Sequence, residues 1–334
     1  MLMLNISRKR VGKGFTYCYA NGETIRRQCK QGRSTIEWIE SLAIPPSWKK
    51  VRISAVKKSK ILALGRDAAG KKQYRYNESF VRKRQKQKYN RLISFAESLS
   101  AMRKATKSHL ESTELDKNKV LACMVRLIEQ AYFRPGNDQY TKDNNTYGLT
   151  TLRSKHLSYE DGELVFNYVG KSGKEQERHI QDSRLASIVR ELDEKPGYRI
   201  FKYYENGEKK YIKSKDLNEY ITQYMGHEYS AKDFRTWAGT FLAALALDKK
   251  PLARCKSDKQ KHISEAVKEV AKALGNTPAV ARANYIDPRV IARYKNSITL
   301  KSVSCGKVFD KLMRKHTELS NEEAGVLCLL STPA

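Results

Sequence analysis

The 334-residue sequence has no closely spaced cysteines, no long apolar run and comparatively few acidic residues. Its six cysteines are scattered, without a C-x-x-C pair and without histidines at ligand spacing, which argues against a zinc site and a disulfide framework. The longest uncharged apolar stretch, Trp237 to Leu247, has eleven residues, whereas a membrane-spanning helix needs about 20. Aspartate and glutamate form no D-x-D-type cluster, so a metal-dependent nuclease is also disfavoured. These absences predict a protein without a membrane span, a metal site or disulfides.

Basic residues are in large excess, and they are concentrated in one segment. Sixty-five lysines and arginines against 36 acidic residues give a formal net charge of +29, which indicates a polyanionic partner. The 43 residues from Lys49 to Arg91 contain sixteen of these cations and only two acidic residues. A solvated charged face would also explain such a segment, but the interleaved aromatics of Gln73-Tyr74-Arg75-Tyr76 favour DNA or RNA. Cations neutralise phosphates, while tyrosines can contact bases or sugars.

Length and pattern together predict an α+β protein of two domains with a short extension. Residues 1–100 are expected to form a small β-rich domain, whose strand-like runs precede a helical pattern from about Glu78 to Leu99. The expected strands are Phe15–Ala20, Thr24–Arg27, Val51–Val56 and Ile61–Leu64. Polar residues from Ser100 to Lys117 suggest a hinge, and residues 101–300 are expected to form a larger, mainly α-helical domain. Residues 301–334 are expected to form a helical extension, because Ser320 and Glu323 form a capping-box pattern.

One motif in the first domain is a near match to a nucleotide-binding loop. Gly65 to Lys71 fits the first seven positions of a P-loop, but the eighth is Lys72, where a Ser or Thr hydroxyl must hold magnesium. The residues that follow alternate like a strand instead of opening a helix. We therefore expect no nucleotide cofactor.

In the second domain, candidate functional residues fall at the ends of predicted elements. A helical pattern must stop before Pro135, which leaves Arg134 in a loop. The alternating run Leu164–Val169, a Gly-Lys-Ser-Gly-Lys turn and a returning strand to Ile180 predict a hairpin with Lys171 at its tip.

Candidate functional residues nearer the C-terminus also lie at the ends of predicted helices. Ser230 and Asp233 form a capping-box pattern at the start of a helix that carries Arg235 in its first turn, where free N–H groups favour an anion. A second helix closes at Gly275, a Thr-Pro pair opens a short third one, and Tyr285 lies at its end.

Taken in order, these residues resemble the active-site string of type IB DNA topoisomerases of the poxvirus and bacterial kind. The matching pieces are Arg134, Lys171, Lys232-Asp233-Phe234-Arg235-Thr236-Trp237, Gly275-Asn276-Thr277-Pro278 and Tyr285, with Gly65-Arg66-Asp67 and Gln73-Tyr74-Arg75-Tyr76 upstream. The resemblance covers roughly residues 50–295. Each piece is weak alone, but five in the same order and at similar spacing are specific. Asn276 departs from the poxvirus pattern, which has His there, and matches the bacterial one, so a proton-transferring role at this position is in doubt.

This resemblance implies a two-lobed DNA clamp, with a catalytic domain of the tyrosine recombinase and type IB topoisomerase kind, that relaxes supercoiled DNA without ATP or metal. Tyr285 would attack phosphorus to form a covalent 3′-phosphotyrosyl intermediate. Arg134 and Arg235 would hold the phosphate oxygens, Asn276 would add a hydrogen bond, and Lys171 would protonate the leaving 5′ oxygen. Independently of any family, metal-free cleavage of a phosphodiester needs a nucleophile, cations and an acid. The expected DNA-binding residues are Arg66, Gln73, Tyr74, Tyr76, Arg82, Arg84 and Tyr140.

Other interpretations of the same residues remain open. Taken singly, Tyr285 could be a packing residue, the two arginines could form surface salt bridges, and Lys171 could be a solvated turn lysine. A tyrosine site-specific recombinase or integrase uses the same chemistry, but usually carries His-x-x-Arg where this chain has Lys232-Asp233-Phe234-Arg235. A non-enzymatic architectural DNA-binding protein is supported by charge alone.

The expected surroundings of the protein follow from the same features. We expect double-stranded DNA as its partner, with no cofactor and no membrane contact. We also expect it to act as a monomer. Met1-Leu2-Met3-Leu4 and the polar, basic residues after it lack the apolar region of a secretory signal. We therefore expect an intracellular location, either a bacterial cytoplasm and nucleoid or, for a viral protein, the host cell or virion.

Overall fold

The computed structural model describes residues 4–160, 163–251, 253 and 255–331, and the chain forms two compact units, residues 1–90 and 91–334. The division falls inside the longest helix, α2 (Glu78–Leu110), whereas the sequence suggested a boundary at residue 100. The hinge expected from Ser100 to Lys117 is wrong, because α2 continues to Leu110 and α3 (Lys117–Ala131) begins soon after. Leu99, Met102 and Leu110 are buried along this part of α2 and keep it helical despite its polar composition.

The first unit is built on a five-stranded antiparallel sheet, in the order β2-β1-β3-β4-β5. Its strands are β1 (Ile6–Val11), β2 (Gly14–Tyr19), β3 (Lys49–Ile53), β4 (Ile61–Arg66) and β5 (Lys72–Tyr76). The helix α1 (Lys30–Ser41), which the sequence analysis missed, buries Ile36 and Ile39 in the small core beside the sheet. The expected strand Thr24–Arg27 is reduced to a single bridge between Thr24 and Cys18.

The nucleotide-loop near match is a hairpin turn. β4 and β5 pair directly, and Gly70, with a φ of 75°, closes the turn by donating its N–H to the Asp67 carbonyl at 3.0 Å. Asp67 then accepts from the backbone N–H of Lys71 at 2.9 Å. A strand thus stands where a phosphate-binding loop needs a helix.

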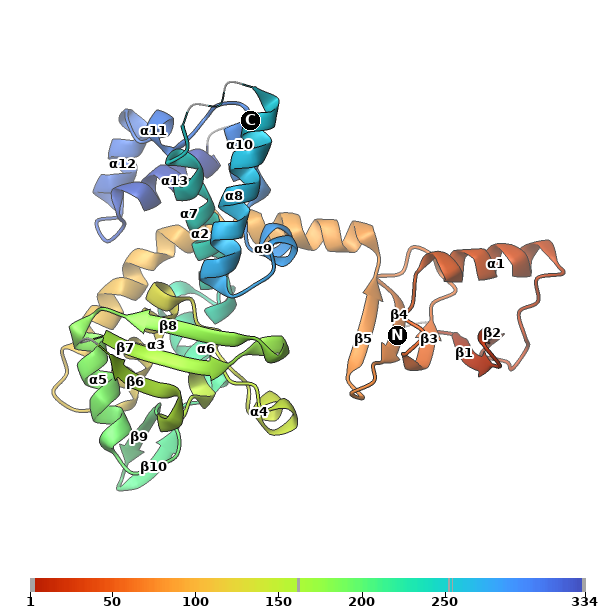
Figure 1. The fold of residues 1–334 in the computed structure, drawn as a ribbon, viewed down its shortest axis with the longest axis horizontal. Coiled ribbons are helices and arrows are strands. Elements are labelled where there is room, and N and C mark those ends of the chain that lie inside the picture. Colours follow the sequence, from red (N-terminus) through yellow and green to blue (C-terminus); the bar gives the residue numbers. More distant parts are fainter. Residues whose placement is uncertain (1–3, 161–162, 252, 254, 332–334) are drawn as a thin grey trace. The chain divides into compact units, whose positions relative to one another are not determined.

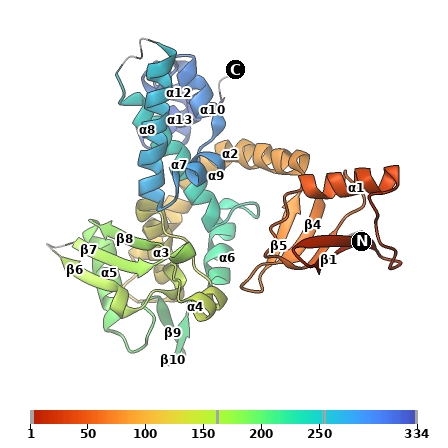
Figure 2. The ribbon, with the colours of Figure 1, turned by 45° about the vertical axis from the view of Figure 1, so that its right-hand side comes forward.

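The second unit is mainly helical, with one three-stranded antiparallel sheet, β6-β7-β8, and a small hairpin, β9-β10. Figures 1 and 2 show α5 against the three-stranded sheet and α8 beside α7. Its elements up to α6 are α4 (Asp138–Asn144), η1 (Leu149–Thr151), η2 (Ser154–His156), β6 (Leu157–Glu160), β7 (Glu163–Val169), η3 (Lys171–Gly173), β8 (Glu175–Ile180), α5 (Ser183–Glu194), β9 (Lys202–Glu205), β10 (Glu208–Tyr211) and α6 (Ser214–Met225). The remaining elements are α7 (Ala231–Asp248), α8 (Lys256–Leu274), α9 (Pro278–Asn284), α10 (Pro288–Lys295), α11 (Leu300–Val303), α12 (Lys307–Lys315) and α13 (Asn321–Ser331).

The C-terminal helices belong to the same core. The predicted capping box is confirmed at the start of α13, where Ser320 Oγ accepts from the Glu323 N–H at 3.2 Å and Glu323 Oε2 accepts from the Ser320 N–H at 3.0 Å. α13 buries Val326, Leu327 and Leu330 among the residues of the large helical core.

The architecture confirms the predicted order of a β-sheet region followed by a mainly helical domain. No helix in the described part of the chain is both long and apolar enough to span a membrane.

Candidate active site

Arg134 lies in a tight loop directly after α3. The helix ends at Tyr132, whose left-handed φ of 58° turns the chain. The backbone N–H groups of Leu149 and Thr150, in η1, donate to the carbonyls of Arg134 and Pro135 at 2.9 Å each. Hydrogen bonds from η1 therefore hold the loop, and they fix the position of the Arg134 backbone.

Arg235 is a buried member of α7, with 2% of its surface exposed. Its Nη1 donates to the Tyr132 carbonyl, and its Nη2 donates to the Leu274 carbonyl at 2.8 Å. Among the described residues its buried Nε–H has no hydrogen-bond partner. Two carbonyls thus orient the guanidinium, and its Nε–H remains available to a ligand.

Asn276 sits between two helix ends. Gly275 closes α8 with a φ of 61°, and Thr277 caps α9 by accepting from the Val280 N–H at 3.3 Å. The Asn276 side chain accepts from Arg134, with 2.5 Å between Oδ1 and Nη2. Its buried Nδ2 group has no partner within the part of the chain that the structure describes. Asn276 therefore orients Arg134 with one end and offers a donor with the other.

Tyr285 follows α9 and is partly buried against α7. The guanidinium carbon of Arg235 lies 5.2 Å from its ring centre. Thr240 Oγ1 donates to the Tyr285 carbonyl at 3.2 Å and accepts from the Asp287 N–H at 3.0 Å. A Cβ built on Gly239 would lie 2.7 Å from the Tyr285 carbonyl oxygen, so only glycine allows this approach.

The electrostatics of these residues favour an anionic ligand. Burial, followed by the charges of Arg134 and Arg178, lowers the pKa of Arg235 to about 10, against the opposing effect of the Tyr285 phenol. Burial and the charge of Arg134 also lower the pKa of Arg178. Arginine remains protonated at neutral pH in such surroundings, so the site holds three guanidinium charges at a cost in desolvation. A bound phosphate would offset that cost and satisfy the free donors of Arg235 and Asn276.

Lys171 is the one predicted catalytic residue that stands apart. It lies exposed at the tip of the β7–β8 hairpin, as the sequence predicted, where Ser172 and Gly173 both have positive φ. In the described structure it makes no hydrogen bond to the other four residues. The turn can therefore bring its amine to a substrate without first breaking an ion pair.

Sequence reasoning missed three residues that shape the site: Arg178, Tyr168 and Thr240. Strand alternation signalled the first two, because Phe166, Tyr168 and Arg178 belong to one face of the β7–β8 pair. For Thr240, the signal was the neighbouring Gly239, because a glycine inside a helix can mark a place where another backbone segment packs closely.

Two of the expected DNA-binding residues take part in the β4–β5 turn. Arg66 Nη1 donates to the Gly70 carbonyl at 2.7 Å, and Gln73 Nε2 donates to Asp67 Oδ2 at 2.7 Å. The hydrogen bonds from the Lys71 backbone N–H and from the Gln73 side chain lower the pKa of Asp67. The turn thus presents Arg66 and Gln73 in fixed orientations.

Two more candidates form an exposed aromatic surface on β5. The rings of Tyr74 and Tyr76 stack with centroids 5.7 Å apart, and their exposed fractions are 39% and 43%. Phe80 continues the surface, 5.7 Å from Tyr76. Because side chains alternate along a strand, Gln73 belongs to the opposite face.

The remaining candidates lie on helices. Arg82 and Arg84 are exposed near the start of α2, where Arg82 pairs with Glu78 at 3.3 Å and Arg84 lies 6.0 Å from the Phe80 ring centre. The backbone of Tyr140 belongs to α4, but its side chain lies outside what the structure describes.

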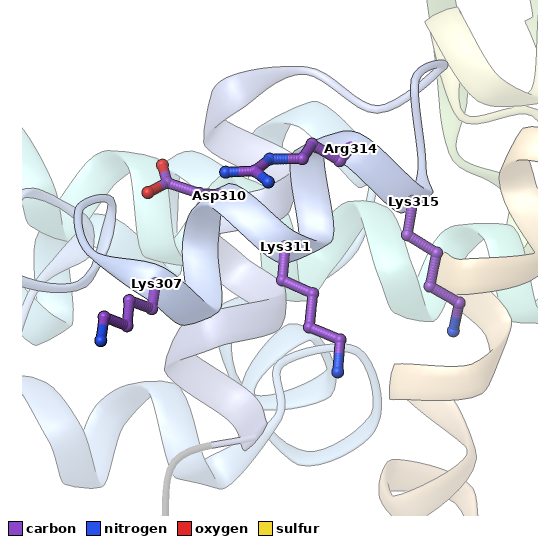
Figure 3. Close-up of a pocket in the computed structure, with 5 residues that line it drawn as sticks. All are labelled: Lys307, Asp310, Lys311, Arg314 and Lys315. Carbon is purple, nitrogen blue, oxygen red and sulfur yellow. The ribbon is translucent and has the colours of Figure 1, made fainter.

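Two hollows of the second unit are lined by residues other than the five predicted catalytic ones. Figure 3 shows the larger one, of about 580 Å³, on the basic face of α12, lined by Lys307, Asp310, Lys311, Arg314 and Lys315. A second, of about 220 Å³, is bordered by Arg103, Glu129, Tyr132, Phe234, Trp237 and Glu323, among others. Within the described residues no three His, Cys, Asp or Glu side chains are grouped so that they could hold a metal ion.

Comparison with known proteins identifies the family. The family model "Eukaryotic DNA topoisomerase I, catalytic core" matches residues 77–310, and "Bacterial DNA topoisomerase IB, N-terminal domain" matches residues 14–67. The protein named DNA topoisomerase 1B of Acanthamoeba polyphaga mimivirus is 32% identical over 305 residues, which cover 89% of each chain. This chain belongs to the type IB DNA topoisomerases.

More distant members of the type IB topoisomerase family match as well. The DNA topoisomerase 1B of Vaccinia virus (strain Copenhagen) is 25% identical over 249 residues, 74% of this chain and 76% of the viral protein. The DNA topoisomerase 1 of Rabbit fibroma virus is 27% identical over 266 residues, 78% of this chain and 80% of that protein. The resemblance to poxvirus and bacterial type IB topoisomerases is thus confirmed. Membership of this family makes the chain an isomerase that acts on DNA.

Proposed function

We propose that this topoisomerase relaxes supercoiled duplex DNA by reversible transesterification, with Tyr285 as the nucleophile and without ATP or metal. One observation carries the assignment of residues. Arg235 contacts the Tyr285 ring while its Nε–H and the Asn276 amide nitrogen, both buried, lack partners among the described residues. A tyrosine beside unfilled donors is the arrangement that attack on a phosphodiester requires.

In the proposed step, Tyr285 Oη forms a bond to phosphorus and the bond from phosphorus to the 5′ oxygen breaks. The phenol proton passes to solvent, and the 5′ oxygen takes a proton from Lys171 Nζ as it leaves. The phosphate remains a diester, now joined to tyrosine on its 3′ side. Attack by the 5′ hydroxyl reverses each transfer, so religation needs no external energy.

The other residues stabilise the charge that develops on the non-bridging oxygens. Arg134 and Arg235 present planar forks of N–H donors, which match phosphate geometry better than lysine does. Asn276 adds a neutral hydrogen bond and orients Arg134. Preorganised donors of this kind typically contribute about 3 kcal/mol each to lowering the barrier.

The binding of DNA is proposed to involve both parts of the chain in a clamp. The β-rich region, about residues 1–100, supplies the basic segment from Lys49 to Arg91 and the exposed tyrosines of β5. The helical part, about residues 101–300, supplies the chemistry on a fold of the tyrosine recombinase kind, and α13 extends its core. We propose that one copy is sufficient, since all five chemical residues come from a single chain.

Plasmid relaxation with the full chain, in EDTA and without ATP, tests this function. Wild type should relax a supercoiled plasmid of any sequence and form a denaturation-resistant DNA adduct. Tyr285→Phe should do neither while binding DNA normally, because only the nucleophilic hydroxyl is lost. Tyr198→Phe, at a tyrosine that is 54% exposed, is the matched control and should behave as wild type.

Three outcomes would contradict the proposal. An adduct formed by the Tyr285→Phe variant would mean that another tyrosine is the nucleophile. Activity that requires paired sites would identify a recombinase. A wild-type chain that binds DNA but leaves the linking number unchanged would be an architectural protein.

A further inference from the structure

Arg178 is a partly buried arginine of β8 that none of the expected catalytic roles uses. Its Nη1 donates to the Ala273 carbonyl, and its Nη2 donates to Gln176 Oε1 at 2.8 Å. Its Nε–H is buried and unpaired within the described structure. A side chain that gives up solvation for so many contacts holds its surroundings in one arrangement.

The main contact of Arg178 is with the end of α8, directly before Asn276. Arg178 binds the carbonyl of Ala273, and Arg235 binds that of Leu274, the next residue. The last carbonyls of a helix lack intrahelical partners and carry partial negative charge, so cations stabilise them. Two arginines, one from β8 and one from α7, thus fix the helix end from which Asn276 projects.

Gln176 fills the space between this helix end and the hairpin of Lys171. A Cβ built on Gly275 would lie 2.1 Å from Gln176 Oε1 and 2.9 Å from Arg178 Nη2, so the turn packs directly on both side chains. A Cβ built on Gly170 would lie 2.8 Å from Gln176 Cγ. Gly170 precedes Lys171, so Gln176 contacts the base of its turn as well.

We propose that Arg178 is a positioning residue for DNA cleavage, which holds the Gly275–Asn276 turn so that Asn276 and Arg134 meet the scissile phosphate. The inference rests on the proposed function of the site. Arg178 acts through Asn276, not as a proton donor. Lysine cannot replace it, because one ammonium cannot hold the Ala273 carbonyl and the Gln176 side chain in the geometry of a guanidinium fork.

Single-turnover cleavage of a duplex by the full chain tests this role. Arg178→Met should slow cleavage at least about 10-fold, since displacing catalytic groups by about 1 Å can cost about 100-fold. Arg178→Lys, which is milder for folding, should be slowed similarly, while the dissociation constant for uncleaved DNA stays within about threefold. Arg184→Met, at an exposed arginine of α5, is the matched control and should cleave as wild type.

Two further measurements separate positioning from a general structural defect. If Arg178 acts through Asn276, adding Arg178→Met to Asn276→Ala should slow cleavage little further, because residues that share one function are not additive. A substrate whose leaving 5′ oxygen is replaced by sulfur should be slowed as much as the ordinary one, because no acid has been lost. Fully multiplicative effects, or rescue by sulfur, would overturn the inference.

The result also distinguishes this inference from the proposed function. If wild type forms the Tyr285 adduct and both Arg178 variants cleave at its rate, only the role of Arg178 is wrong. If wild type forms no such adduct, the proposed function fails and this inference fails with it.

Discussion

The guanidinium carbon of Arg235 lies 5.2 Å from the ring centre of Tyr285, and one helix sets this relationship. Arg235 belongs to α7, and Thr240, further along α7, holds the Tyr285 carbonyl. Between them, Gly239 lets the Tyr285 backbone pack against the helix. Because a helix is a rigid element, the cation and the proposed nucleophile keep their spacing even though Tyr285 lies after the end of α9.

The hydroxyl of Thr240 should therefore matter for cleavage. Thr240→Val removes the donor to the Tyr285 carbonyl and leaves the Asp287 N–H buried without its acceptor, which should cost about 1–3 kcal/mol of stability. Single-turnover cleavage should slow while DNA binding is retained. Thr240→Ser keeps the hydroxyl and should restore both stability in urea and the cleavage rate. Equal cleavage by the two variants would show that other contacts hold Tyr285.

Lys171 should be needed only when the leaving group needs a proton. Lys171→Ala should slow cleavage of an ordinary strand far more than that of a strand whose leaving 5′ oxygen is sulfur, since a thiolate leaves without protonation. Lys174→Ala, at the other end of the same turn and equally exposed, should affect neither substrate. Equal slowing on both substrates by Lys171→Ala would leave it a solvated turn lysine.

Local signals in the sequence were sufficient for the elements that carry the site. The capping pattern of Ser230 and Asp233, the glycine that closes α8, and the Thr-Pro start of α9 each depend on a few adjacent residues, and each is where the sequence predicted. The hairpin that exposes Lys171 depends on the same kind of short-range rule.

What the sequence did not reveal depends on distant partners or weak signals. Arg178 gains its role from a carbonyl 95 positions away, which no periodicity reports. The start of α1 is capped by Cys29, whose sulfur accepts from the Gly32 N–H, and cysteine is not among the usual capping residues. The end of α2 was misjudged as a hinge because its polar composition outweighed the buried positions Met102 and Leu110.

His156 should make the protein sensitive to mild acid. Burial, with help from Lys155 and Arg153, lowers its pKa from 6.5 to about 4, and its Nδ1 accepts from the Arg153 N–H at 3.1 Å, which requires the neutral ring. The unfolded chain binds the proton more readily, so this contribution is complete above about pH 6.5 and is lost as pH falls toward 4. The loss should approach about 3 kcal/mol.

Urea unfolding across this pH range measures the effect. His156→Gln should flatten the dependence of stability on pH, whereas His227→Gln, at an exposed histidine, should leave it unchanged. A wild-type slope retained in the His156 variant would assign the acid sensitivity to other groups.

The cations at the start of α2 should contribute to DNA affinity through the phosphates. Each phosphate neutralised contributes about −0.9 to the slope of log affinity against log salt. Changing Arg82, Arg84 and Lys86 to Gln should therefore flatten that slope by up to about 2.7 and weaken binding most at low salt. All three side chains are exposed, so the change should leave stability nearly intact.

The basic face of α12 provides a control of equal charge. Changing Lys307, Lys311 and Arg314 to Gln removes three cations from an equally exposed helix, shown in Figure 3, without touching the proposed DNA-binding segment. The net charge then falls equally in both triple variants, so a difference in slope reports where the cations lie relative to DNA. If the α2 triple and the α12 triple flatten the slope equally, the basic segment of Lys49 to Arg91 has no special place in binding. The clamp proposal would then lose its electrostatic basis.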